Sequence, residues 1–216
     1  MDIRDGSRAI EPLDMLYSER EIARLVAGFA FRDQQRWEDL CDLFWGDAHL
    51  SISWFSGSIA EFVSQSRSMA ANPAMRLKHV IGQPKIECVE NRATGDTDIC
   101  IMVRAPIGDS ATIVDVTTWA RFVDRFERRN GTWKIVRRVA VYDKDRADPW
   151  APGTLIKWRT PVHVYSRFPE AYRSLATMLS DLGRKEMRAA IVSGTSDEQE
   201  LLAAQHAWLH ENQCDG

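Results

Sequence analysis

The sequence predicts an α+β protein in which helices precede a β-sheet along the chain. Apolar residues recur at helical spacing from Ile22 to Phe44, and most of the chain from His49 to Tyr142 alternates apolar and polar residues as strands do. Within that second region, Asn130-Gly131 is a strong signal for a two-residue hairpin turn. The length of 216 residues, with 44% hydrophobic and 27% charged residues, fits one globular domain with a substantial appendage.

Charge and composition exclude several classes of protein. Lys and Arg number 28 against 31 Asp and Glu, and the resulting net charge of -3 offers no basic field for nucleic acid. No apolar run approaches the roughly 18 residues of a membrane span, and the first residues do not resemble a signal peptide. The cysteines lie far apart, without the spacing of a zinc knuckle or a disulfide framework. We therefore expect a cytoplasmic, reduced protein with neither nucleic acid nor membrane as a partner.

The N-terminal part is expected to hold a loose arm over residues 1–13 and then a long helix. Ser18 and Glu21 fit a capping box that starts this helix, and an apolar stripe follows as far as Phe29. Asp33, four residues beyond Phe29, continues the stripe. Because an unpaired buried charge is very costly, this carboxylate needs a partner.

The same periodicities predict the remaining elements. Further helices are expected at residues 37–46, 59–69, 170–190 and 196–211. Strands, about four to six in the sheet, are expected within residues 49–55, 78–89, 97–104, 112–128 and 133–142. The chain then divides into an arm (1–13), a core domain (14–146) and a helical C-terminal extension (147–216).

The hairpin predicts a face of mixed character. With a regular register from the turn, one face carries arginines beside aromatic rings: Arg121, Arg138, Trp119 and Tyr142. Asp124 would then face Arg137 on the other side of the sheet. The mixed face is compatible with a ligand pocket that has polar groups at its edges, and equally with a solvated surface. Trp54, on the apolar side of the first expected strand, is a further candidate for contact with a ligand.

Several segments together resemble the SnoaL-like family of the nuclear transport factor 2 superfamily. They are the helix ending at Asp33, the segment Phe44-Trp45-Gly46-Asp47-Ala48, the isolated His79, and the hairpin from Val123 to Ile135. The resemblance covers about residues 14–146. It implies a cone-shaped fold, in which a curved mixed or antiparallel sheet packs on the N-terminal helices. Residues 147–216 lie outside the resemblance and form the helical C-terminal extension that the periodicity predicts.

Within that superfamily the motifs are most similar to hexachlorocyclohexane dehydrochlorinase and, more loosely, to scytalone dehydratase. The resemblance implies that Asp33 orients His79, that His79 acts as a general base, and that Arg138 stabilises the developing anion. Gly28 departs from the dehydrochlorinase pattern, which has a lysine that contacts the leaving group. The alternative is structural: His79 is then a buried, hydrogen-bonded histidine and Asp33 a helix-end cap.

The function predicted on this basis is a cofactor-independent lyase for a small, hydrophobic, aromatic substrate. It would act by dehydration, or by loss of a small fragment such as formaldehyde from a lignin-derived aromatic diol, with Tyr142, Trp119, Trp54 and Arg121 around the substrate. One alternative is an isomerase or cyclase of the ketosteroid-isomerase or polyketide-cyclase type, which typically uses a carboxylate base. The other is a non-catalytic small subunit of a ring-hydroxylating dioxygenase.

Other motifs are weak. His206 and His210 are four residues apart, but no third ligand is evident, so we expect a surface pair and no metal. No glycine-rich phosphate motif occurs, and no nucleotide cofactor is expected. The apolar stripes of the tail must be buried on the outside of the core, over the mouth of the cone, or against another subunit. We expect the last, in a homo-oligomer that is a dimer or a trimer.

Overall fold

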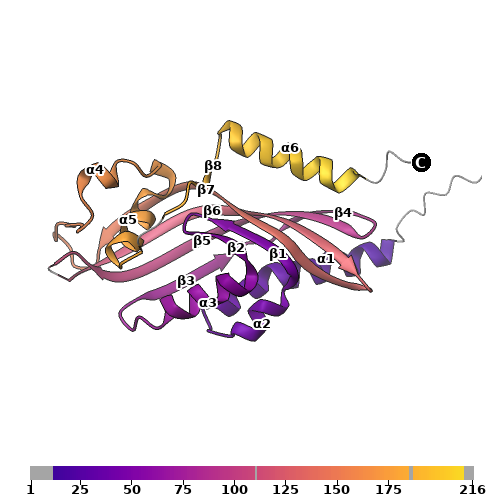
Figure 1. Cartoon of the computed structure of the whole chain (residues 1–216), viewed down its shortest axis with the longest axis horizontal. Helices are drawn as coiled ribbons and strands as arrows, with labels where there is room; N and C mark the ends of the chain where they lie inside the picture. Colours follow the sequence, from indigo (N-terminus) through magenta and orange to yellow (C-terminus); the bar gives the residue numbers. More distant parts are fainter. Residues whose placement is uncertain (1–11, 110, 185–186, 212–216) are drawn as a thin grey trace, which may run out of the picture.

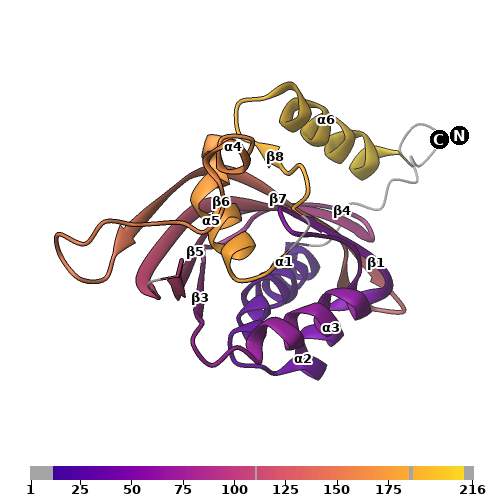
Figure 2. The ribbon, with the colours of Figure 1, turned by 60° about the vertical axis from the view of Figure 1, so that its left-hand side comes forward.

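A computed structural model describes residues 12–109, 111–184 and 187–211, and it confirms the α+β fold class. One curved mixed sheet separates the helices α1, α2 and α3 from the helix α6 (Figure 1 and Figure 2). The helical elements are α1 (Pro12–Ala27), η1 (Gly28–Arg32), α2 (Trp37–Asp42), α3 (Ile59–Ala70), α4 (Val162–Tyr165), η2 (Glu170–Tyr172), α5 (Arg173–Asp181) and α6 (Ser196–His210). The strands are β1 (Phe44–Ile52), β2 (Phe55–Ser58), β3 (Arg76–Ile81), β4 (Lys85–Val89), β5 (Arg92–Ile107), β6 (Thr112–Arg129), β7 (Thr132–Pro149) and β8 (Ile191–Val192).

The sheet is built around three long antiparallel strands. Its order is β2-β1-β7-β6-β5-β3, with β4 also paired to β5 and β8 also paired to β7. The pairs β1–β7 and β7–β8 are parallel, and the others are antiparallel. Over the described residues the sheet has eight strands, so the expectation of about four to six was too low. The main core lies between the sheet and the N-terminal helices, and residues of η2 and α5 complete it.

The first helix starts earlier than expected. α1 already includes Pro12, the first described residue, and the buried Ser18 lies inside the helix rather than at its cap. Residues 1–11 of the expected arm lie outside the described residues. A capping box does occur further on: Ser58 and Glu61 exchange hydrogen bonds at the start of α3.

The second helix ends sooner than expected, because strand pairing competes with it. α2 stops at Asp42, and Phe44 already pairs with Ile135 of β7. The backbone N–H of Ile135 donates to the carbonyl of Leu43 over 3.0 Å. The expected helical continuation to Gly46 was therefore wrong.

The hairpin has the expected turn but not a regular register. Asn130 and Gly131 both have positive φ, as a two-residue turn of this type requires. A bulge then shifts the register between Arg125 and Phe126. Beyond it Asp124 faces Arg138, whereas the regular register would have placed Arg137 there.

The tail is less helical than expected over residues 170–190. Its helix ends at Asp181, and Gly183 follows with a φ of 95°, a conformation that terminates helices. Leu175 and Leu179 of α5 line one cavity together with Phe29 of η1 and Phe62 of α3, so α5 covers the same side of the sheet as these N-terminal elements.

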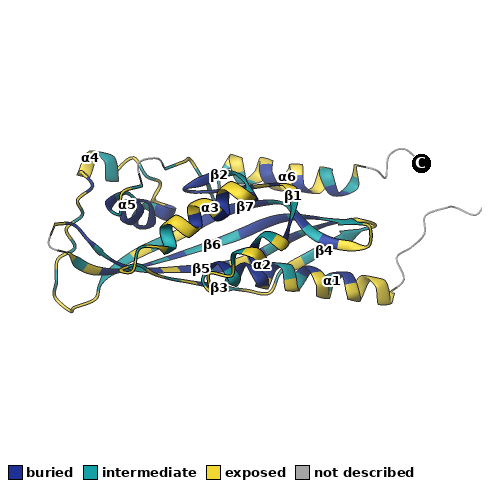
Figure 3. Cartoon of the chain, turned by 60° about the horizontal axis from the view of Figure 1, so that its bottom comes forward, coloured by how far each residue is buried: buried dark blue, intermediate teal, exposed yellow. Residues whose placement is uncertain are grey.

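The last helix lies on the opposite face of the sheet. Leu201 of α6 packs on Val123, Val139 and Val141, and the buried residues of α6 form one line along the helix (Figure 3). Leu175 and Leu179 of α5 and Leu201 and Leu209 of α6 are thus buried within the same chain, whereas Leu202 of the expected stripe is exposed. The contact with another subunit stays a prediction.

Candidate functional site

The centre of the candidate site is a carboxylate–histidine pair. Asp33 follows directly after η1, and His79 lies in β3. One carboxylate oxygen of Asp33 lies 2.7 Å from Nδ1 of the His79 ring, and the other accepts the backbone N–H of His79 over 2.6 Å. The two side chains are only 5% and 6% exposed. The partner that a carboxylate on the apolar stripe needs is therefore His79.

The surroundings keep the imidazole neutral. Burial lowers the pKa of His79, and the charges of Arg32 and Arg138 lower it further, whereas Asp33 raises it. For Asp33 burial acts to raise the pKa, but the hydrogen bonds from His79 outweigh it and the pKa is lowered. The result is an ionised carboxylate beside a neutral histidine, and this pairing fixes Nδ1 as the protonated ring nitrogen. Nε2 has no hydrogen-bond partner within the described part of the chain.

His79 lies on the wall of an apolar inner cavity. The walls come from η1, α3, the sheet and α5, and they are mainly aromatic and aliphatic: Phe29, Phe62, Phe122, Trp54, Tyr142, Ile101, Leu175 and Leu179 are among them. The free volume is about 40 Å³. Since roughly 150 Å³ is needed for a benzene ring, an aromatic ligand must displace some of these side chains.

Arg32 is a cavity residue that the sequence analysis did not single out. Its guanidinium lines the cavity with only 6% of the residue exposed, and Nε donates to Ser66 Oγ over 3.2 Å. Its carbon Cζ lies 5.6 Å from the Trp54 ring, and no carboxylate among the described residues lies within ion-pair distance. Burial lowers its pKa to about 10. The sequence did contain a signal for Arg32: it lies three residues after Phe29, so that a cationic side chain continues the apolar stripe of the helix.

Arg138 lies behind the cavity wall rather than in it. It donates to the two carboxylate oxygens of Asp124 over 2.8 and 2.6 Å, and both side chains are fully buried. Its carbon Cζ lies 4.1 Å from the Phe122 ring centre and 4.8 Å from that of Phe29. Since both rings line the cavity, Arg138 supports them from behind.

The other candidates divide between the two faces of the sheet. Tyr142 and Trp54 line the inner cavity, and the Tyr142 hydroxyl accepts the backbone N–H of Ser53 over 3.2 Å. Arg121 lies on the outer face, where it pairs with Asp96 and with Glu198 of α6. Trp119 shares that face and contacts the Lys144 amine, 5.1 Å from its ring centre. The bulge separates these residues: it turns Arg138 and Tyr142 inward and leaves Arg121 and Trp119 outside.

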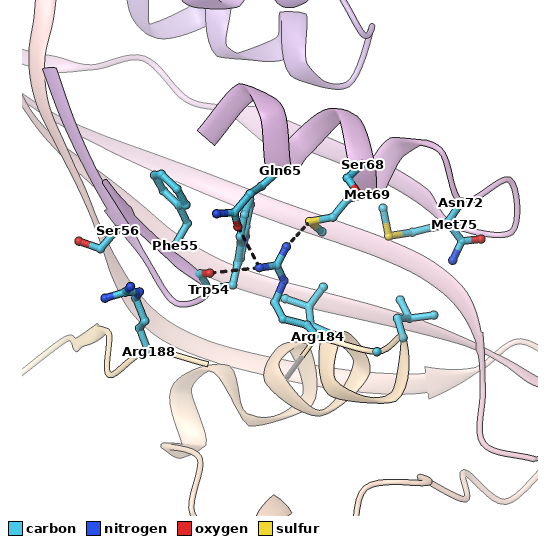
Figure 4. A pocket seen from close by; sticks show the side chains of 13 residues that line it. Trp54, Phe55, Ser56, Gln65, Ser68, Met69, Asn72, Met75, Arg184 and Arg188 are labelled. Carbon is cyan, nitrogen blue, oxygen red and sulfur yellow. Dashed lines mark hydrogen bonds between the residues drawn. The ribbon is translucent and has the colours of Figure 1, made fainter. Parts of the chain in front are cut away.

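A second, outer cleft of about 460 Å³ adjoins the inner cavity. It lies between α3, the β1–β2 turn and the segment after α5, and the guanidinium of Arg184 stands at its centre (Figure 4). Cavity and cleft share four lining residues, which we call the neck: Trp54, Met69, Met75 and Leu179.

Two further observations concern metal ions and membranes. Within residues 12–109, 111–184 and 187–211, no group of three or more His, Cys, Asp or Glu side chains is placed to hold a metal ion. His206 and His210 contact each other on α6, with ring centres 4.5 Å apart. No helix in the described part of the chain is long and apolar enough to cross a membrane.

The fold and site define a cone-shaped α+β protein with an apolar inner cavity and a carboxylate–histidine pair in its wall. A family model described as a SnoaL-like domain matches residues 14–139, which is more than half of the chain. The chain belongs to the SnoaL-like family. A search of curated proteins finds no match.

Solved structures show the same fold. The structure of LinA is 22% identical, with a TM-score of 0.52 over 69% of this chain and 98% of LinA. A putative scytalone dehydratase from Novosphingobium aromaticivorans DSM 12444 is 17% identical, with a TM-score of 0.52 over 68% of this chain and 95% of its own. LinA-type3, a hexachlorocyclohexane dehydrochlorinase from Novosphingobium barchaimii LL02, is 18% identical, with a TM-score of 0.53 over 68% of this chain and 99% of its own. The similarity is one of fold.

Proposed function

We propose that the protein is a cofactor-independent lyase that acts on a small, largely hydrophobic, aromatic substrate. The observation that carries the proposal is the pairing of Asp33 with His79 in the wall of an otherwise apolar cavity. A buried, oriented and neutral imidazole in such a place is suited to remove a proton from a bound ligand.

In the proposed mechanism His79 is the general base. Asp33 holds Nδ1, so Nε2 is the nitrogen that accepts a proton from a carbon or a hydroxyl of the substrate. The imidazolium that forms is stabilised by the adjacent carboxylate. In a dehydration the proton comes from a carbon, the C–H electrons form the C=C bond as the C–O bond breaks, and the imidazolium returns its proton to the departing hydroxide. In the loss of formaldehyde the proton comes from the hydroxyl, the C–C bond breaks as the C=O bond of formaldehyde forms, and the electron pair of the C–C bond stays on the aromatic fragment, which takes up the proton from the imidazolium.

The negative charge that develops on the substrate needs a cation within the cavity. Arg32 lines the cavity and has no carboxylate of its own among the described residues, so it is better placed for this role than Arg138, which is committed to Asp124. Arg138 then acts as a positioning residue behind Phe29 and Phe122.

Two observations narrow the class of reaction. Both oxygens of Asp33 are engaged by His79, which argues against an isomerase that uses a free carboxylate base. At Gly28 a side chain would begin 2.6 Å from Leu43 Cδ2, so the place of the dehydrochlorinase lysine is crowded. LinA-type3 is a dehydrochlorinase and another structural neighbour is a putative dehydratase; their names support elimination chemistry, and the crowding at Gly28 favours a leaving group other than chloride.

The experiment is a comparison of wild type with His79→Asn on a panel of aryl propanediols and hydroxylated bicyclic ketones, with products followed by NMR. We expect turnover to fall by roughly a hundredfold or more, because a general base typically contributes that much. His49→Asn is the matched control, since His49 is exposed on β1 and, among the described residues, its ring forms a hydrogen bond only with Ser56. Full activity of a folded His79→Asn variant would overturn the proposal.

A further inference from the structure

The outer cleft differs in character from the inner cavity. Its lining contains Arg184 and Arg188 together with the polar side chains of Gln65, Ser68 and Asn72, and no carboxylate among its described residues. The neck residues belong to both spaces, so a ligand that reaches His79 through the neck also extends into the cleft.

Among the described residues, the acceptors of the Arg184 guanidinium in this cleft are weak. Nη1 donates to the carbonyl of Trp54 over 3.4 Å and to Gln65 Oε1 over 3.3 Å, and Nη2 lies 3.1 Å from the sulfur of Met69 (Figure 4). The first two distances are longer than the usual length of about 2.9 Å for such bonds, and a thioether is a weak acceptor. The guanidinium is half-buried, and burial lowers its pKa. A partly desolvated cation with neutral, weak acceptors gains most from an anionic one.

Trp54 links the two spaces through its indole ring. The Arg184 guanidinium carbon lies 4.3 Å from the ring centre, and the Arg32 guanidinium carbon lies 5.6 Å from it. One arginine lines the inner cavity and the other the outer cleft. The neck therefore offers an aromatic surface with a cation in the space on each side.

We propose that the outer cleft is a binding subsite for an acidic oxygen group, a carboxylate or a phenolate, at the end of an elongated aromatic substrate whose reactive part lies beside His79. The position of the reactive part of the substrate beside His79 rests on the proposed lyase function. Arg184 supplies the charge and a planar set of donors that fits a carboxylate. The aromatic portion of the ligand lies in the neck against Trp54.

The test is equilibrium binding, which needs no turnover. Isothermal titration calorimetry with trans-cinnamate and with its neutral counterpart trans-cinnamamide measures the preference for the carboxylate. We expect wild type to prefer cinnamate, Arg184→Gln to lose about tenfold in cinnamate affinity with cinnamamide unchanged, and Arg184→Lys to keep part of the preference. Arg146→Gln is the matched control, because Arg146 pairs with Asp148 on the exposed part of β7. The preference should also weaken as salt is added.

Three results would overturn the subsite. One is a wild type that binds the amide as well as the acid. Another is an Arg184→Gln variant that loses both ligands equally. The third is a preference that disappears in Arg32→Gln but persists in Arg184→Gln, which would place the carboxylate in the inner cavity. His79→Asn should retain the preference for cinnamate, so failure of the lyase proposal and failure of the subsite are seen in separate measurements.

Discussion

Asp33 holds His79 at two points at once: one carboxylate oxygen contacts the ring Nδ1 at 2.7 Å, and the other accepts the backbone N–H of the same residue at 2.6 Å. The carboxylate therefore fixes both the position of β3 and the orientation of the imidazole. With Nδ1 engaged in this way, Nε2 is the nitrogen left to act on a ligand. The tautomer of His79 and its alignment both depend on this one residue.

The first prediction concerns the charge of that carboxylate. Asp33 raises the pKa of His79, so Asp33→Asn should lower it further below its usual value near 6.5. The acid limb of the pH profile of kcat/KM should move to lower pH, and the maximum should fall by roughly a hundredfold, because the imidazolium loses its stabilising anion. A limb that stays in place in an Asp33→Asn variant of unchanged stability would contradict the assignment of His79 as the titrating base.

Substitution of Arg32 should shift the same limb in the opposite direction. The charge of Arg32 lowers the pKa of His79, so Arg32→Gln should raise it and move the acid limb of kcat/KM to higher pH. The maximum rate should also fall, because the anion that develops loses its nearest cation. Arg36→Gln serves as control, since Arg36 is exposed and pairs with Asp39. Equal pH profiles for the Arg32 and Arg36 variants would show that Arg32 does not act on His79.

The buried Arg138–Asp124 pair predicts a stability effect. Arg138→Met should cost about 3–5 kcal/mol in free energy of unfolding, because it leaves the Asp124 carboxylate fully buried without its partner. The double variant Arg138→Met/Asp124→Leu should recover most of that loss, since an apolar pair of similar volume can replace a buried ion pair. Urea unfolding of the two variants measures the difference. A double variant as unstable as the single one would mean that Arg138 contributes mainly through its contacts with Phe29 and Phe122.

Two truncations should separate the two parts of the tail. Ending the chain after Gly194 removes α6 and exposes Val123, Val139 and Val141, each worth about 1.5–3 kcal/mol when fully buried. The melting temperature should fall, and the protein should aggregate or change its assembly, as judged by light scattering. Ending it after Asp148 also removes α5 and uncovers the inner cavity, so an apolar dye should bind this form more strongly. If the form that ends after Gly194 melts and sediments like the full chain after correction for mass, α6 is dispensable, and the same result for the form that ends after Asp148 would mean the same for α5.

Patterns local in sequence determined much of the fold. Helical and strand periodicities located the N-terminal helix, α3, α6 and the long strands, because each pattern reports which side of an element is buried. The residues Asn130-Gly131 predicted the turn, because asparagine and glycine tolerate the positive φ that this turn requires, and both positions adopt it. The contact of Asp33 with His79 was anticipated from two signals together: a carboxylate on an apolar stripe and a family resemblance.

Only the tertiary structure decided which of the remaining candidates meet. The bulge beside Arg125 changes the face of the β7 residues from Arg137 to Tyr142, until a second bulge between Trp119 and Ala120 shifts the register again. The local sequence does not indicate either bulge, because one extra residue in a strand has no distinct periodicity. The bulge beside Arg125 places Arg138 opposite Asp124, with which it forms a buried ion pair. Arg121 stays on the outer face, where it pairs with Glu198 of α6. The cavity wall was likewise beyond local patterns, since it joins η1, β3 and α5, which are far apart in the chain. Propensity and periodicity act over a few residues, whereas the packing of such distant segments follows from the shape of the whole sheet.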